Sequence, residues 1–136
     1  MGNLTQPSIQ VLLVDDDTML LRSLSRVLSE RGFEVDTAIC AAEARAILKH
    51  RPFDVVVCDQ NMPGQSGLEL LTELKQDHPD LIAMLLSGQV SGVPVAQDWA
   101  KEIGVSRVFS KPCDGNDIAH AIYECMEFRK VSCSKR

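Results

Sequence analysis

Four apolar runs in this sequence each end in side chains that can bind a cation or an anion. Those side chains are the acids Asp15, Asp16, Asp17 and Asp59, the hydroxyl of Ser87 and the amine of Lys111. If the runs are neighbouring parallel strands, their carboxyl ends share one edge of a sheet, where open α/β proteins bind their ligands. The spacing therefore predicts that these groups form one site.

The chemistry of such a site follows from its charges. Gathered carboxylates repel one another unless a positive charge is shared between them, and oxygen ligands favour Mg²⁺ over zinc. Lys111 adds a second positive charge, and Ser87 adds a hydroxyl donor. Phosphoryl fits this receptor best, because its transfer depends on positioning and on neutralised oxygens. Asp59 is then a candidate nucleophile, since carboxylates form aspartyl phosphates.

Strand and helix patterns alternate along the chain that must position these groups. Strand patterns occupy residues 9–15, 33–39, 53–59, 81–88 and 105–112, and helix patterns occupy residues 18–32, 41–50, 66–79, 93–104 and 116–130. Asp17 is a candidate N-cap and Gly32 a candidate C-terminal stop of the first helix. The alternation predicts an α/β fold, a doubly wound five-stranded parallel sheet with helices on both faces.

The composition is that of one globular domain. The 136 residues are 45% hydrophobic and 24% charged, with a net charge of -5. An acidic chain with scattered basic residues argues against direct nucleic-acid binding, and no apolar run is long enough for membrane insertion. Without a signal-peptide pattern we expect a cytoplasmic protein, whose five cysteines stay reduced and mostly buried.

Four stretches of this sequence resemble the receiver domain of two-component response regulators. They are "VLLVDDD" (11–17), "VVVCDQNMPGQSGLELL" (55–71), "LLSG" (85–88) and "SKP" (110–112). A match in several parts and in order is more specific than one short motif, and it implies the flavodoxin-like strand order 2-1-3-4-5. We therefore expect a flexible N-terminus at 1–8, a receiver domain at 9–129, and a C-terminal tail or the start of a linker at 130–136.

The resemblance implies roles for the acids. Asp59 would be the phosphoacceptor, loaded from a sensor histidine kinase or a phosphotransfer protein. Asp16 and Asp59 would bind Mg²⁺ directly, Asp15 would assist, and Asn61 would give its backbone carbonyl; Mn²⁺ can take the place of Mg²⁺.

The resemblance also implies roles for residues other than the acids. Ser87 and Lys111 would hold the phosphoryl oxygens, and the Lys111–Pro112 peptide bond would be cis. Asn61 and Gln89 occupy positions that tune the lifetime of the phosphoryl group.

Two positions depart from the family pattern, and one of them is Cys113, which stands where an aromatic is common. Many receivers carry a switch aromatic three residues before the lysine, where this chain has Val108. Strand alternation would place the neighbouring Phe109 on the opposite face, in the core.

The implied function is a phosphorylation-activated switch rather than an enzyme acting on other molecules. Residues 93–129 would form the face that binds an effector or output domain, with Trp99 and Tyr123 as candidate contacts, and would allow a phosphorylation-dependent homodimer. Two alternatives remain open. One is a degenerate receiver that acts as a phosphorylation-independent interaction module. The other, less favoured, is a Mg²⁺-dependent phosphatase, which would want a second Asp where Asn61 stands and a cap insertion.

Overall fold

Five parallel strands form a single sheet in the computed structural model of the chain. The structure describes residues 8–88 and 100–134, and it describes side chains only up to Phe128. The strands are β1 (Gln10–Val14), β2 (Glu34–Ala38), β3 (Val55–Asp59), β4 (Ile82–Ser87) and β5 (Val105–Ser110). Their order is β2-β1-β3-β4-β5, and every neighbouring pair is parallel. The predicted fold class and strand order are confirmed.

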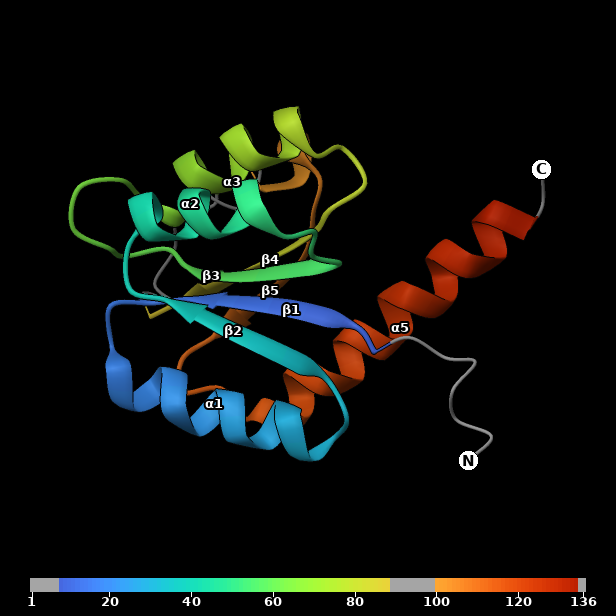
Figure 1. Cartoon of the computed structure of the whole chain (residues 1–136), viewed down its shortest axis with the longest axis horizontal. Coiled ribbons are helices and arrows are strands. Elements are labelled where there is room, and N and C mark those ends of the chain that lie inside the picture. Colours follow the sequence, from blue (N-terminus) through green and yellow to red (C-terminus); the bar gives the residue numbers. More distant parts are fainter. Residues whose placement is uncertain (1–7, 89–99, 135–136) are drawn as a thin grey trace.

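Helices cover both faces of this sheet (Figure 1). They are α1 (Thr18–Glu30), α2 (Ala41–His50), α3 (Gly67–Asp77) and α5 (Gly115–Ser134). α1 and α5 lie on one face, and α2 and α3 lie on the other. Of the helix predicted at 93–104, residues 100–103 are helical, while Trp99 and the residues before it lie outside the described part of the chain.

Helix α5 is longer than the sequence pattern predicts. The expected end lay near residue 130, but the helix continues to Ser134. Residues 125–134 contain neither glycine nor proline, so nothing in the local sequence stops the helix once it has begun.

The core lies in two layers, one on each side of the sheet. Alternate residues of the central strands point to opposite faces. In β3, Val56 and Cys58 pack in the layer under α2 and α3, and Val55 and Val57 pack in the layer under α1 and α5. All four side chains are at most 1% exposed, which explains why β3 is a continuous apolar run.

The helices that follow β1 and β3 begin at capping residues. Asp17 caps α1, accepting a hydrogen bond from the backbone N–H of Leu20 (3.1 Å), as predicted. At the start of α3, the Ser66 hydroxyl accepts from the N–H of Glu69, and the Glu69 carboxylate accepts from the N–H of Ser66, which is a capping box. These caps fix where the chain turns after each acid-bearing strand.

The cysteines are free thiols in the described residues, as predicted, but they are less buried than expected. Cys58 is fully buried, whereas Cys40, Cys113 and Cys125 are half-buried. Burial, followed by the charges of Asp59 and Asp15, raises the pKa of the Cys58 thiol well above its ordinary value of 9.0.

We expect Cys58 to make the protein lose stability at alkaline pH. Above pH 9 the unfolded chain releases the thiol proton while the folded chain keeps it, so rising pH favours unfolding. The loss should be about 1 kcal/mol between pH 9 and pH 10. Urea denaturation across this range should show a weaker pH dependence in Cys58→Ala than in the native chain. Equal pH dependence would contradict the prediction, and Cys40→Ala serves as the control.

None of the described helices is long and apolar enough to cross a lipid bilayer.

Candidate functional site

The carboxyl ends of β1, β3, β4 and β5 bring the predicted side chains to one edge of the sheet. Asp59 is the last residue of β3, and Asp15 follows β1 directly. The register places Val14 beside Cys58, so the residues that follow are also neighbours. At the other side of β4, Ser87 pairs with Ser110, which precedes Lys111.

Three of the acids form a compact cluster. Asp15, Asp16 and Asp59 each offer a carboxylate oxygen, and these oxygens lie within 4.8 Å of one another. Asp15 and Asp59 are only 1% and 3% exposed, whereas Asp16 is exposed. The fourth acid, Asp17, is the α1 cap, and its backbone N–H donates to Asp15 Oδ1 (2.9 Å).

The amine of Lys111 lies between the two buried acids. Its Nζ donates to Asp15 Oδ2 at 3.0 Å and is 3.2 Å from Asp59 Oδ1. The Lys111 backbone N–H donates to the carbonyl of Ser87 (2.9 Å), which ties the ends of β4 and β5 together. The Lys111–Pro112 peptide bond is cis, as the family resemblance implied.

The charges of this cluster act on one another strongly. Burial, together with the negative charge of Asp15, raises the pKa of Asp59, although Lys111 and the backbone N–H of Asn61 act in the opposite direction. Burial by itself lowers the pKa of Lys111, but its contacts with Asp15 and Asp59 outweigh this, and the pKa is raised. At neutral pH the lysine is therefore charged, and it compensates the two buried carboxylates only in part.

One oxygen of this cluster has no hydrogen-bond partner among the described residues. This oxygen, Asp59 Oδ1, is fully buried and forms an ion pair with Lys111 Nζ at 3.2 Å, but the two atoms do not have hydrogen-bond geometry. A buried acceptor in this state is costly unless a further cation or donor reaches it. An unsatisfied carboxylate oxygen beside two other carboxylates fits the oxygen donor set that hard divalent cations prefer.

The turn after Asp59 comes close to the site. Gly64 has a positive φ of 86°, and Gly67 packs so tightly that a Cβ there would overlap the carbonyl oxygen of Asp59. The exposed Asn61 stands at the start of this turn, where its backbone N–H acts to lower the pKa of Asp59. Sequence reasoning missed Gln60, whose side chain accepts from the N–H of Leu68 (2.9 Å), because no motif marks this residue.

The two residues of β5 that precede the site face opposite ways, as predicted. Val108 is 44% exposed, and Phe109 packs against the core layer of α1 and α5. Gln89, the other predicted tuning position, lies outside the described residues.

We expect the Lys111→Met variant to depend on divalent cations for its stability. Removing the amine leaves Asp15 and Asp59 buried without their shared cation, which should cost about 2 kcal/mol, less than for a fully buried pair. Because a metal would contact the same carboxylates, Mg²⁺ should raise the melting temperature of Lys111→Met more than that of the native chain.

Thermal unfolding with and without Mg²⁺ measures this effect. Lys101→Met, which removes an exposed amine, is the matched control. Equal Mg²⁺-induced shifts in Lys111→Met and the native chain would show that Lys111 and the cation do not share the same acids.

Fold and site together define a class, a flavodoxin-like α/β protein with an acidic cluster at the carboxyl edge of its sheet. Residues 11–123 match the response regulator receiver domain. The chain belongs to this family, whose members are signalling domains of two-component systems and typically work with Mg²⁺ and a phosphoaspartate.

Known proteins similar to this chain agree with that assignment. The chain is 35% identical to the photosynthetic apparatus regulatory protein RegA of Cereibacter sphaeroides over 112 residues, covering 82% of this chain and 60% of RegA. It is 33% identical to the acid tolerance regulatory protein ActR of Rhizobium meliloti, covering 90% of this chain and 62% of ActR. The chain thus spans less than two thirds of the length of these relatives.

A solved structure shows the same fold. The CheY-like receiver domain protein of Methanospirillum hungatei superposes with a TM-score of 0.86 at 25% identity, covering 93% of this chain and 99% of that chain.

Proposed function

We propose that this chain is a phosphorylation-activated switch in which Asp59 accepts a phosphoryl group. The observation that carries the proposal is the buried Asp59 carboxylate, in which one oxygen has no hydrogen-bond partner within the described part of the chain and forms an ion pair with the Lys111 amine at 3.2 Å. A carboxylate of this kind is a nucleophile with a fixed position, and the nearby lysine neutralises its charge only in part. Membership of the receiver family supports the same role.

The acids would hold the metal that this chemistry needs. Asp16 and Asp59 would bind Mg²⁺, or Mn²⁺ in its place, with Asp15 assisting and the Asn61 carbonyl as a further ligand. Bound there, the cation would supply the positive charge that neutralises phosphoryl oxygens.

The proposed transfer runs from a phosphohistidine of a sensor histidine kinase or phosphotransfer protein. A carboxylate oxygen of Asp59 attacks phosphorus while the phosphorus–nitrogen bond breaks, and the departing imidazole nitrogen keeps the electron pair and takes up a proton. Lys111 and Ser87 hold phosphoryl oxygens, and hydrolysis of the acyl phosphate resets the switch. The chain therefore acts on its own Asp59 and not on other substrates.

The consequence of phosphorylation would appear on residues 93–129. We infer that this face binds an effector or output domain, or a second phosphorylated copy, and that Val108, Asn61 and Gln89 tune the response. The receiver domain would occupy residues 9–129, with an N-terminal segment at 1–8 and a tail or linker at 130–136. A cytoplasmic location and the absence of direct nucleic-acid contacts complete the proposal.

Intact mass spectrometry after incubation with a small acyl phosphate, with and without Mg²⁺, tests the function. A phosphoryl adduct that requires Mg²⁺ is expected. If Mg²⁺ binds and no adduct forms, the proposal fails in favour of a phosphorylation-independent interaction module. Val108, in the place of the usual switch aromatic, is the observation that favours that second function.

A further inference from the structure

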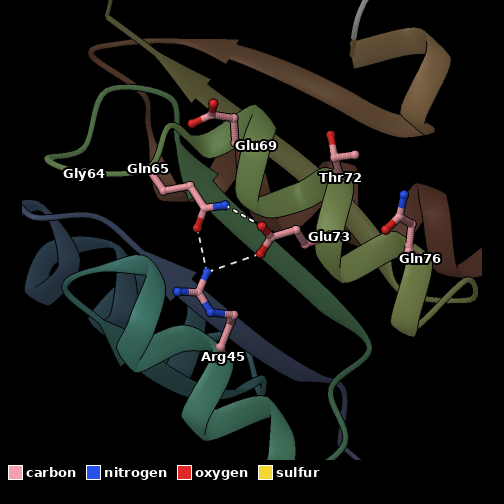
Figure 2. Close-up of a pocket in the computed structure, with 7 residues that line it drawn as sticks. All are labelled: Arg45, Gly64, Gln65, Glu69, Thr72, Glu73 and Gln76. Carbon is pink, nitrogen blue, oxygen red and sulfur yellow. Dashed lines mark hydrogen bonds and ion pairs between the residues drawn. The ribbon is translucent and has the colours of Figure 1, made fainter.

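Three polar side chains from different segments form a closed ring beside the turn that follows Asp59 (Figure 2). Arg45 Nη1 of α2 donates to Gln65 Oε1 at 2.6 Å and lies 3.3 Å from Glu73 Oε1 of α3. Gln65 Nε2 in turn donates to Glu73 Oε2 at 2.8 Å. Each of the three side chains therefore binds both of the others.

The ring holds one end of the turn at residues 60–66. At the other end, the N–H of Gln60 donates to the carbonyl of Leu86 (2.8 Å), and the Gln60 carbonyl accepts from the N–H of Gly67 (3.0 Å). Asn61 lies between the anchors at Gln60 and Gln65. The backbone at Asn61 thus runs between one end held by backbone hydrogen bonds and another end held by the Gln65 side chain.

We propose that Arg45 and Glu73 are positioning residues that act through Gln65 to place the Asn61 carbonyl for the metal. The inference rests on the proposed function, since it assumes that Asn61 is a metal ligand. If the inference holds, Mg²⁺ affinity depends on Arg45, Gln65 and Glu73 as well as on the acidic cluster itself.

Because the side chains of the ring are partly exposed, the ring should affect the conformation of the turn more than the stability of the whole fold. The Arg45 and Glu73 side chains are 42% and 50% exposed. Ion pairs this exposed contribute little to overall stability, about 0–1 kcal/mol. Their effect should be concentrated in the turn, a segment whose local opening costs less than global unfolding.

Whether Mg²⁺ binds more weakly or more tightly after Arg45 is removed distinguishes a positioning role from a purely electrostatic one. Removing Arg45 makes the chain more negative, and by charge alone this should strengthen the binding of a cation. Loss of the ring should loosen the turn and weaken Mg²⁺ binding. The two explanations therefore predict opposite changes for the same substitution.

Isothermal titration calorimetry with Mg²⁺ on the full chain tests the proposal. The variants are Arg45→Ala, Gln65→Ala, the double variant, and the control Arg26→Ala, which removes the same charge from an exposed pair with Glu30 on α1. We expect Arg45→Ala and Gln65→Ala to weaken Mg²⁺ binding by roughly threefold to tenfold, at or below the low end for outer-shell partners of metal ligands. The double variant should be no weaker than the single ones, because both residues act through one turn.

Hydrogen exchange provides a readout that needs no metal. The backbone amides of residues 61–66, apart from Pro63, should exchange faster in Arg45→Ala and Gln65→Ala than in the native chain or Arg26→Ala.

The outcomes are distinguishable. If the native chain binds no Mg²⁺, the metal role in the proposed function fails together with this inference. If the native chain binds Mg²⁺ and Arg45→Ala binds it as tightly as Arg26→Ala does, the positioning role alone is overturned. An effect of Arg45→Ala without one of Gln65→Ala would also overturn it, because the ring would not act through the turn.

Discussion

The Asp59→Asn variant is expected to form no phosphoryl adduct and, without Mg²⁺, to be more stable than the native chain. The first expectation follows from the proposed function, because a neutral amide lacks the carboxylate that would attack phosphorus. The second follows from burial: Asp59 is 3% exposed, stands beside the Asp15 carboxylate, and has one oxygen for which the described residues offer no hydrogen bond. Removing the charge should stabilise the fold by about 1 kcal/mol or more.

Intact mass after treatment with an acyl phosphate and urea denaturation in metal-free buffer measure the two effects. Asp77→Asn, which neutralises an exposed acid at the end of α3, is the matched control for net charge. An adduct that persists in Asp59→Asn would place the phosphoryl group elsewhere. A loss of stability in Asp59→Asn would mean that Lys111 already compensates the buried charge fully.

Gly67→Ala is expected to destabilise the protein strongly and to disturb the acidic site as well. A Cβ at Gly67 would overlap the Asp59 carbonyl oxygen and lie 2.9 Å from its carbonyl carbon. Both are backbone atoms of the central strand and cannot turn aside as the end of a side chain can. The cost should be about 3 kcal/mol, at the upper end for overpacking, and Mg²⁺ binding should weaken because the strand end that carries Asp59 must shift.

Gly64→Ala is the control for this prediction. Gly64 belongs to the same turn and has a φ of 86°, but a Cβ there would meet no atom within 4 Å. Its cost should be about 1–2 kcal/mol, from the backbone conformation alone. If urea denaturation gives a loss for Gly67→Ala no greater than that for Gly64→Ala, the overlap with the Asp59 carbonyl is relieved at little cost and the prediction fails, because Gly67, unlike Gly64, has no positive φ.

The fold could be predicted because its signals are local. Continuous apolar runs such as Val55–Val57 indicate strands buried on both faces, and β3 is such a strand. The location of the acids at one edge of the sheet could also be predicted, because parallel strands present their carboxyl ends together. The predicted end of α5 was wrong by several residues, because no glycine or proline in the sequence marks where the helix stops.

Contacts between distant residues could not be predicted in the same way. The ion pair of Lys111 with Asp15 joins residues that are 96 apart in the sequence. Arg45 lies 20 residues from Gln65 and 28 from Glu73, at positions that read as ordinary exposed helix surface. Such contacts depend on how α2 and α3 pack side by side, which a periodic pattern does not specify.

The single lysine among three clustered acids also sets an order of events. Asp15, Asp16 and Asp59 carry more negative charge than Lys111 can balance, so an incoming anionic donor meets a repulsive field at the sheet edge. In the proposed function, a bound divalent cation would bring the local charge close to zero and remove that barrier. The chain would therefore respond only when two solutes, cation and donor, are present together, with the cation first, and no moving part is needed to enforce the sequence.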